Sequence, residues 1–295
     1  MEYRANGQTF TFTTDIRDDP ARRESFFALA RRTFGLDFEP WYRGGGWQDR
    51  YIPHALVLDG AVAANISVNP IDFMLDGTSR PFVQLGTVMT HPDFRGMGLS
   101  RFLMEAVLQI WRPRCDCLYL FANDTVLDFY PKFGFVPAPE FQPIWAAAPA
   151  TPILRQRLDP DDPADQALLL AAYRRSNPYS AFSMEDNEGL FSFYILGPFR
   201  ECLYSLPGQN AVAILEEDGD TLFCQEILGR PSVELAELLN GLAAPDFRRV
   251  VLGFTPNDPG LRLSYSPGEE HLFLLAEGGN PFEERKILFP QISHA

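Results

Sequence analysis

A short segment with two glycines holds the residues whose chemistry is easiest to interpret. Arg95, Gly96 and Gly98 lie between an apolar stretch that ends near Thr90 and an amphipathic stretch that begins at Leu99. Where a strand turns into a helix, the first helical amides have no partner within the helix and carry the positive end of its dipole. Glycines leave room for a phosphate at these amides, and an arginine adds a suitable positive charge. The segment predicts either a phosphate-binding turn or a turn that only packs a helix tightly against a strand.

A second group of candidate residues follows the next apolar stretch, CLYLFA. Asn123 directly precedes a short helix predicted over residues 124–133, and Tyr130 lies within that helix. Taken alone, Asn123 suits a helix N-cap and Tyr130 suits a packed aromatic residue with its hydroxyl at the surface. The functional interpretation of both groups depends on a resemblance to a known family, in which two such elements occur in this order with strand, helix and strand between them.

Together the two segments resemble the GNAT acetyltransferases. The stretch from Val88 to Pro92, followed by R-G-M-G-L-S, resembles the acyl-CoA pyrophosphate loop of that family, R-x-x-G-x-G/A, with Ser100 in place of the last glycine or alanine. The later segment resembles the family's strand, asparagine, short helix and aromatic ending. Its matching residues are Asn123, Phe129, Tyr130, Gly134 and Phe135. The resemblance covers the chain well from residue 1 to about 145 and the remainder only weakly.

The resemblance implies a site for acetyl-CoA as co-substrate. The strand that carries Val88 and Thr90 is expected to part from the next parallel strand, with the pantetheine arm held between them by backbone amides. One of these amides would stabilise the oxyanion that develops on the acyl carbonyl. Tyr130 is the implied general acid toward the CoA thiolate, because phenols and thiols have similar pKa values. The implied cofactor-binding residues are Val88, Met89, Thr90, Arg95, Gly96, Met97, Gly98, Leu99, Ser100, Arg101 and Asn123.

The sequence does not assign the base that takes the proton from the amine. Several GNAT enzymes use a glutamate on the pantetheine strand, and Gln84, which stands near that position here, cannot act as a base. The acceptor is expected to enter beside the first helices, or between the two halves of the chain. Five aromatic residues either line that entrance or only cover the sheet: Phe34, Phe38, Trp41, Tyr42 and Trp47.

A mixed sheet with flanking helices is needed to position these residues. Residue patterns predict a strand at 8–14, a helix at 20–34, strands around Asp59-Gly60 and Asp76-Gly77, a helix after Gly98, a strand over CLYLFA and a strand from Phe135. This order and the family resemblance predict an α/β (α+β) protein with the GNAT fold. Its sheet would be mostly antiparallel, with splayed parallel strands at the centre.

The second half of the sequence repeats part of this order. Residues 138–163, rich in proline and alanine, are expected to form a linker. A helix over 164–175 is expected next, then strands around Asp218-Gly219, a helix over 233–242 and two more strands, RRVVLGF and HLFLLAE. No glycine-rich turn stands between strand and helix here. We therefore expect two domains, residues 1–147 with the acyl-CoA site and residues 148–295 as a degenerate GNAT-like domain.

Composition limits the classes of partner. The 295 residues carry a formal net charge of −14, which opposes binding to a nucleic acid. There is no apolar run long enough to cross a bilayer and no signal-peptide pattern, so we expect a cytoplasmic protein that does not bind a membrane. The four cysteines and four histidines show no spacing typical of a metal site. A Walker A motif is absent, and a Rossmann loop would need a third glycine.

The expected function is acetyl transfer to a primary amine of a small-molecule acceptor. Two alternatives stay open, a non-catalytic acyl-CoA-binding or regulatory module and a protein acetyltransferase. The sequence leaves the acceptor, the acyl-chain preference and the formation of a homo-oligomer undecided.

Overall fold

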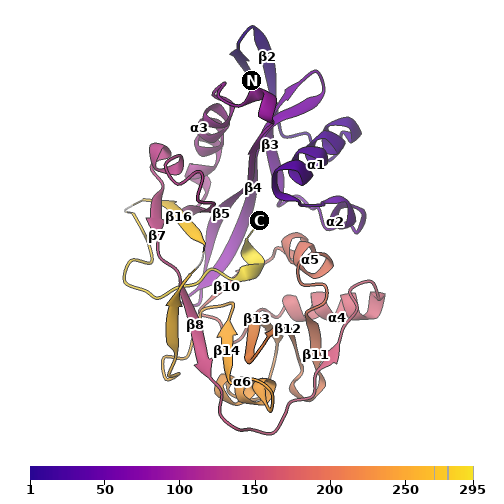
Figure 1. Cartoon of the computed structure of the whole chain (residues 1–295), viewed down its shortest axis with the longest axis vertical. Helices are drawn as coiled ribbons and strands as arrows, with labels where there is room; N and C mark the ends of the chain where they lie inside the picture. Colours follow the sequence, from indigo (N-terminus) through magenta and orange to yellow (C-terminus); the bar gives the residue numbers. More distant parts are fainter. Residues whose placement is uncertain (269, 278, 295) are drawn as a thin grey trace.

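Two β-sheets, one above the other along the long axis of the molecule, form the frame of the protein (Figure 1). The computed structural model describes residues 1–268, 270–277 and 279–294. The first sheet is built mainly from the N-terminal half of the chain and the second mainly from the C-terminal half. None of the helices in these ranges is both long and apolar enough to span a membrane.

The first sheet has the strand order β1-β2-β3-β4-β5-β6-β16-β7, with β10 paired to β4. Neighbouring strands are antiparallel except β5 and β6, which are parallel and joined through helix α3, Leu99–Trp111. The strands are β1 Glu2–Ala5, β2 Gln8–Thr13, β3 Ile52–Leu58, β4 Ala61–Leu75, β5 Thr78–Thr90, β6 Cys117–Ala122, β7 Val136–Ala138, β10 Phe182–Glu185 and β16 His271–Ala276.

Two tight turns build the centre of the first sheet. Asp59 and Gly60 join β3 to β4, and Asp76 and Gly77 join β4 to β5. Their φ angles are 50°, 84°, 51° and 75°, the left-handed values that two-residue hairpin turns require. Both hairpins predicted from the Asp-Gly pairs are confirmed.

Two helices precede this meander and cover one face of the sheet. Helix α1 spans Pro20–Phe34, as predicted, and its N-cap Asp19 accepts hydrogen bonds from two backbone amides. The short helix α2, Glu39–Arg43, lies within the segment that was expected to be an aromatic loop. Aromatic side chains from α1 and from the α2 region pack together over the sheet, among them Phe26, Phe27, Phe38, Trp41 and Trp47.

The second sheet repeats the central arrangement of the first. Its order is β15-β8-β14-β13-β12-β11-β9, and its parallel pair, β13 and β14, is joined through helix α6, Leu235–Ala243. Its strands are β8 Phe141–Ala146, β9 Gln156–Arg157, β11 Leu203–Leu206, β12 Ala211–Asp218, β13 Thr221–Gly229, β14 Arg249–Leu252 and β15 Ser264–Pro267. Helices α4, Pro163–Tyr173, and α5, Glu188–Leu196, complete this half.

The two halves exchange strands, which corrects two predictions. The expected linker at 138–163 contains β8, which lies inside the second sheet between β14 and β15. HLFLLAE was expected to belong to the second unit, but β16 lies between β6 and β7 of the first sheet (Figure 1). It pairs with β6 over six consecutive residues and buries four of its own, as an interior strand should. The division at residues 147 and 148 stays a prediction.

The short helix predicted over residues 124–133 is also wrong in extent. Only Tyr130–Phe133 is helical, as a 3₁₀ turn, η3, that ends at Gly134. The Asn123 side chain instead accepts a hydrogen bond from the Thr125 amide, which forms a turn, and Pro131 cannot donate a helical hydrogen bond.

Candidate active site

Strands β5 and β6 part halfway along their length. Their pairing joins Phe82 to Cys117, Val83 to Leu118 and Gln84 to Tyr119, and it ends there. Beyond this point β6 stays paired with β16 on its other side, whereas β5 continues to Thr90 beside β4. The predicted splay of the two parallel strands is therefore present, and it leaves one side of the end of β5 without a strand.

A cavity of about 1180 Å³ occupies this opening and extends between the two halves. The first half contributes residues 84–90, the loop before α3 and the turn after β6. The second half contributes residues from α5, β12 and β13 and from the last segment of the chain. Of the predicted site residues, Val88, Met89, Thr90, Arg95, Ser100, Asn123 and Tyr130 line the cavity, whereas Gly96, Met97, Gly98, Leu99 and Arg101 lie in the loop and first helical turn beside it.

A bulge turns the end of β5. Asn65 pairs with Met89 and Ser67 with Gly86, so two residues of β5, Thr87 and Val88, stand opposite one residue of β4. Thr87 has a φ of 44°, which is unusual for a β-branched residue and is held only where its surroundings compensate. The bulge interrupts the register with β4 at Val88, one of the two positions, with Thr90, at which a backbone amide was expected to meet the acyl group.

A buried chain of hydrogen bonds holds the bulge in place. Asn65 Nδ2 donates to Ser67 Oγ at 2.9 Å, and Ser67 Oγ donates to the Tyr51 hydroxyl at 3.0 Å. This leaves the Tyr51 proton for Thr87 Oγ1, 2.6 Å away, while Asn65 Nδ2 also donates to the Thr87 carbonyl at 3.1 Å. Sequence reasoning missed this network, although Asn65, Ser67 and Asn69 alternate on one face of an otherwise apolar strand.

The loop before α3 has the geometry expected of an anion-binding turn. Gly96 and Gly98 have φ angles of 78° and 81°. A Cβ atom at Gly98 would lie 2.6 Å from the Tyr3 hydroxyl, which donates to the Met97 carbonyl, whereas a Cβ at Gly96 would meet nothing within 4 Å. The first helical bond runs from the Phe102 amide to the Gly98 carbonyl, so the amides of residues 99–101 have no acceptor within the helix.

Tyr130 and Asn123 lie on the opposite side of the opening. Tyr130 is 4% exposed and packs among the rings of Phe129, Phe135 and Phe273. Burial raises the pKa of its phenol to about 12, so the hydroxyl stays protonated at neutral pH. Asn123 accepts from the Thr125 amide in a turn rather than as the expected N-cap of a helix, and it also lines the cavity.

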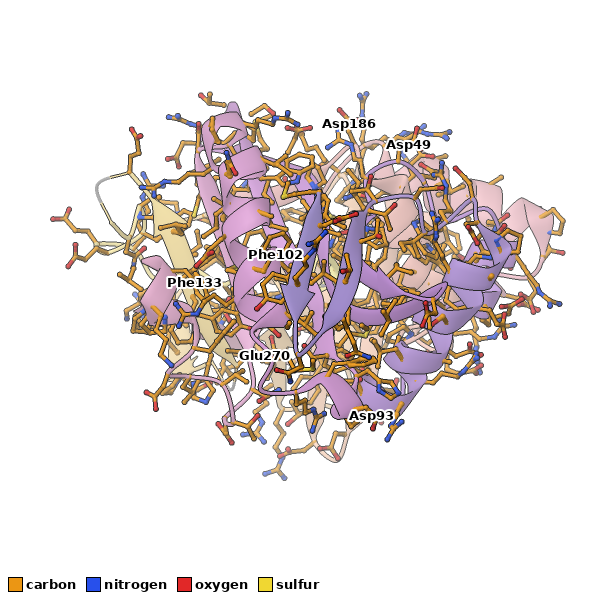
Figure 2. The ribbon with its side chains drawn as sticks, turned by 90° about the horizontal axis from the view of Figure 1, so that it is seen from above. Asp49, Asp93, Phe102, Phe133, Asp186 and Glu270 are labelled. Carbon is orange, nitrogen blue, oxygen red and sulfur yellow. The ribbon has the colours of Figure 1, made fainter. Side chains whose placement is uncertain are left out.

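The second half closes the other side of the cavity. His294 Nδ1 lies 2.8 Å from Glu270 Oε2, and both residues line the cavity. In the view from above, Glu270 lies on the same side of the molecule as Asp93, a residue of the turn after β5 (Figure 2). Asp49 and Asp186 lie at the opposite edge. Sequence reasoning treated the histidines as isolated, and no local pattern connects His294 to Glu270.

The aromatic residues near α2 have both predicted roles. Phe38 and Trp41 are each 3% exposed and pack in the cluster over the sheet, yet they also line the cavity together with Phe34. Tyr42 and Trp47 belong to the cluster and are not among the lining residues. Phe193 of α5 contacts the rings of Phe38 and Trp41, so the second half packs directly on this wall.

The second sheet has no equivalent opening. The β13–β14 pairing continues past Cys224 and Leu252, because the Gly253 amide donates to the Cys224 carbonyl at 2.8 Å. A Cβ atom at Gly253 would lie 2.6 Å from the Gln225 Cα, so the strands are in close contact there. The N-cap of α6 is Glu234, whose negative charge is unsuited to a phosphate.

Among the described residues, no group of three or more His, Cys, Asp and Glu side chains is arranged to hold a metal ion.

Comparison with known proteins agrees with this geometry. Residues 18–135 match the model of the acetyltransferase (GNAT) family. This segment is therefore similar to a GNAT domain. An uncharacterized N-acetyltransferase, ycf52, of Porphyra purpurea is 37% identical to this chain over 54 residues, and the ycf52 protein of Pyropia yezoensis matches equally. That match covers 18% of this chain and 31% of the relative, so it spans about a third of the relative's length.

Solved structures share the fold over most of the chain. A probable N-acyltransferase from Enterococcus faecalis V583 superposes with a TM-score of 0.64 at 14% identity, over 90% of this chain and 72% of its own. Eis1 from Mycobacterium abscessus gives a TM-score of 0.61 at 16% identity, over 90% and 73% of the two chains. The GNAT domain is thus followed by a second unit with a GNAT-like sheet, as the sequence predicted.

Proposed function

We propose that the protein is an N-acyltransferase that moves an acetyl group from acetyl-CoA to a primary amine of a small molecule. The opening between β5 and β6 carries the proposal. It provides an extended backbone edge at residues 85–90 that leads directly to the loop and first turn of α3. Acetyl-CoA has a matching order of groups. Its thioester and pantetheine arm would lie along the strand edge, and its diphosphate would lie at the loop and first turn of α3.

The chain offers suitable contacts for each part of acetyl-CoA. The diphosphate would lie on the amides of residues 96–101, next to the guanidinium of Arg95, where Gly96 leaves open space. Lys132 is a second cation in the cavity wall. The pantetheine arm would run along Val88 to Thr90 in the manner of an added strand.

The bulge and the buried phenol suit the chemistry of acyl transfer. The amide of Val88, a residue of the bulge that stands in register with no single residue of β4, would donate to the acyl oxygen as negative charge develops on it. Tyr130, protonated at neutral pH, would give its proton to the CoA sulfur as the C–S bond breaks.

The part of the cavity between the halves suits a small cationic acceptor. The rings of Phe34, Phe38 and Trp41 line it from the first half, and Phe193 and Phe199 line it from the second. Of the described residues in the second half, Glu216 and Glu270 contribute carboxylates to this wall. Aromatic faces and carboxylates together attract an amine with an apolar body.

The test is CoA release from acetyl-CoA in the presence of a panel of small primary amines. We expect Tyr130→Phe to lower kcat by about 100-fold or more while the affinity for acetyl-CoA is retained. Tyr265→Phe, at a partly exposed tyrosine outside the cavity lining, is the matched control.

Two results would contradict the proposal. If the protein binds acetyl-CoA but no amine accelerates CoA release, it is a binding or regulatory module. If only lysine-containing peptides accelerate release, it is a protein acetyltransferase.

A further inference from the structure

The histidine–glutamate pair in the second half's wall lies against the strand that borders the opening. The His294 ring stacks on Phe121, with a centroid distance of 3.7 Å and an interplanar angle of 25°. Phe121 belongs to β6, beyond the point at which β5 and β6 part. Glu270 immediately precedes His271, which pairs with Ala122 at the end of the same strand.

Two buried tyrosines fix the backbone that carries this imidazole. The hydroxyl of Tyr119, on β6, donates to the Ser293 carbonyl at 2.8 Å, and the hydroxyl of Tyr194, on α5, donates to the His294 carbonyl. Burial raises the pKa of both phenols, so neither hydroxyl ionises near neutral pH. The position of the ring is therefore set by the first sheet and by the second half together.

The hydrogen bond to Glu270 determines which nitrogen of the ring is available. With Nδ1–H donated to the carboxylate, a neutral imidazole carries its lone pair on Nε2. In the described part of the chain Nε2 is shielded from water and has no hydrogen-bond partner. An unpaired buried polar atom is unfavourable, and a ligand that reached Nε2 from the cavity would supply the missing partner.

A further acid near the pair is Glu140, which directly precedes β8. It is 5% exposed, and its carboxyl accepts a hydrogen bond from the Phe289 amide at 2.8 Å. Burial raises the pKa of Glu140 to about 7, although the nearby His294 charge acts in the opposite direction. Among the residues that the structure describes, the titratable groups around His294 include Glu270, Glu140 and the two tyrosines.

We propose that His294, oriented by Glu270, is the base that takes the proton from the acceptor amine. This assignment rests on the proposed acyl transfer. It supplies the group that the first half lacks at Gln84, whose side chain oxygen accepts from Asn69 Nδ2 within the sheet. The base comes from the second half and the thioester site from the first, so neither half is complete without the other.

The proposed step conserves atoms and charge. The amine nitrogen forms a bond to the acyl carbon and loses one proton to His294 Nε2. The C–S bond breaks, and the CoA sulfur takes the proton of Tyr130. Transfer of a proton through solvent from the imidazolium to the phenolate then restores both groups, leaving an amide and free CoA.

His294→Asn separates the chemical role from the structural one. An asparagine amide can still donate to Glu270 from near the position of Nδ1, but it has no basic nitrogen. With the amine that gives the fastest CoA release, we expect kcat/KM to fall about 100-fold or more and acetyl-CoA binding to be unchanged. Glu270→Gln, which keeps the hydrogen-bonding shape without the charge, should cause a smaller loss.

The pH profile provides a readout that a structural role would not change. The pH profile of kcat/KM should differ in shape between the parent and His294→Asn, because only the parent carries a basic nitrogen at this position. The matched control is His271→Asn, since His271 is also paired with a carboxylate, that of Asp124 at 2.7 Å, but does not line the cavity.

NMR of the imidazole tests the assignment without any turnover. The His294 ring in the parent should be the Nδ1–H tautomer at neutral pH, and Glu270→Gln should weaken that preference. A parent ring protonated on Nε2, or a His294→Asn variant as active as the parent, overturns the assignment alone. A parent that releases no CoA with any amine overturns the proposed transfer as well.

Discussion

At the scale of single residues, Glu226 is a carboxyl group placed where its charged form is unfavourable. It is 2% exposed in the second half, and it accepts hydrogen bonds from Asn177 Nδ2 and the Ile227 amide. Burial raises its pKa to about 8 from an ordinary value of 4.5, despite these two bonds. The folded form therefore holds the proton more tightly than the unfolded form, and the contribution of Glu226 to stability falls as pH rises from 4.5 toward 8.

Glu226→Gln should remove this pH dependence. The glutamine oxygen can accept the same two hydrogen bonds and never ionises, so the variant should gain stability over the parent as pH rises from about 5 to 9. Each unit of raised pKa corresponds to about 1.4 kcal/mol. Thermal unfolding followed by circular dichroism measures the difference, with the exposed Glu237→Gln as control. Parallel stability curves for parent and variant would contradict the ionisation.

At the scale of elements, the bulge in β5 connects the fold to the chemistry. Its strained residue, Thr87, is held by Tyr51 from the segment before β3 and by Asn65 from β4. In the proposed reaction, the direction of the Val88 amide would depend on these side chains. Tyr51 is in this sense a positioning residue.

Tyr51→Phe should change the geometry of the bulge without emptying the core. Loss of the hydroxyl leaves Ser67 Oγ and Thr87 Oγ1 without their shared partner, which should lower stability by about 1–2 kcal/mol. If the bulge aims the Val88 amide, kcat should also fall, by about 10-fold or more, with little change in the KM for acetyl-CoA. Tyr42→Phe, in the same aromatic cluster, is the control. A variant that loses stability but keeps kcat would limit Tyr51 to a structural role.

Residue spacing and turn residues in the sequence predicted those elements whose formation depends mainly on residues close to one another in the chain. Helix α1, the Asp-Gly hairpins, α3 and the glycine turn were all found from spacing and turn residues, because each depends on neighbours in sequence. The bulge at Thr87 was not, since a β-branched residue with positive φ has no sequence signature. The strand exchange and the His294–Glu270 pair were missed for a related reason, namely that their partners are far apart in the chain and leave no periodic signal.

At the scale of the whole molecule, strand exchange ties the halves together. β8 precedes the predicted boundary but lies within the second sheet, and β16 follows it but lies within the first. Unfolding one half alone would remove a strand from the other. The buried cluster formed by β4, α4, α5 and the last segment of the chain adds apolar contacts across the same division.

The protein should therefore unfold in one cooperative transition. Calorimetry should show a single endotherm, and fluorescence and circular dichroism should report coincident urea transitions. Leu274→Asp, at a fully buried position in β16, should lower the midpoint of the whole transition, whereas Leu168→Asp, at a position that is 44% exposed, should change it little. Two separable endotherms would show that the halves are independent.

The place of β16 has a consequence for biosynthesis. When residues 1–138 have left the ribosome, every residue expected to contact acetyl-CoA has been made, yet β6 still lacks the neighbour that supports it through Ala122. The strand that fills this place is translated more than a hundred residues later. In the proposed function, the opening for the thioester would thus be completed late in translation, well after the segment that matches the GNAT family has emerged.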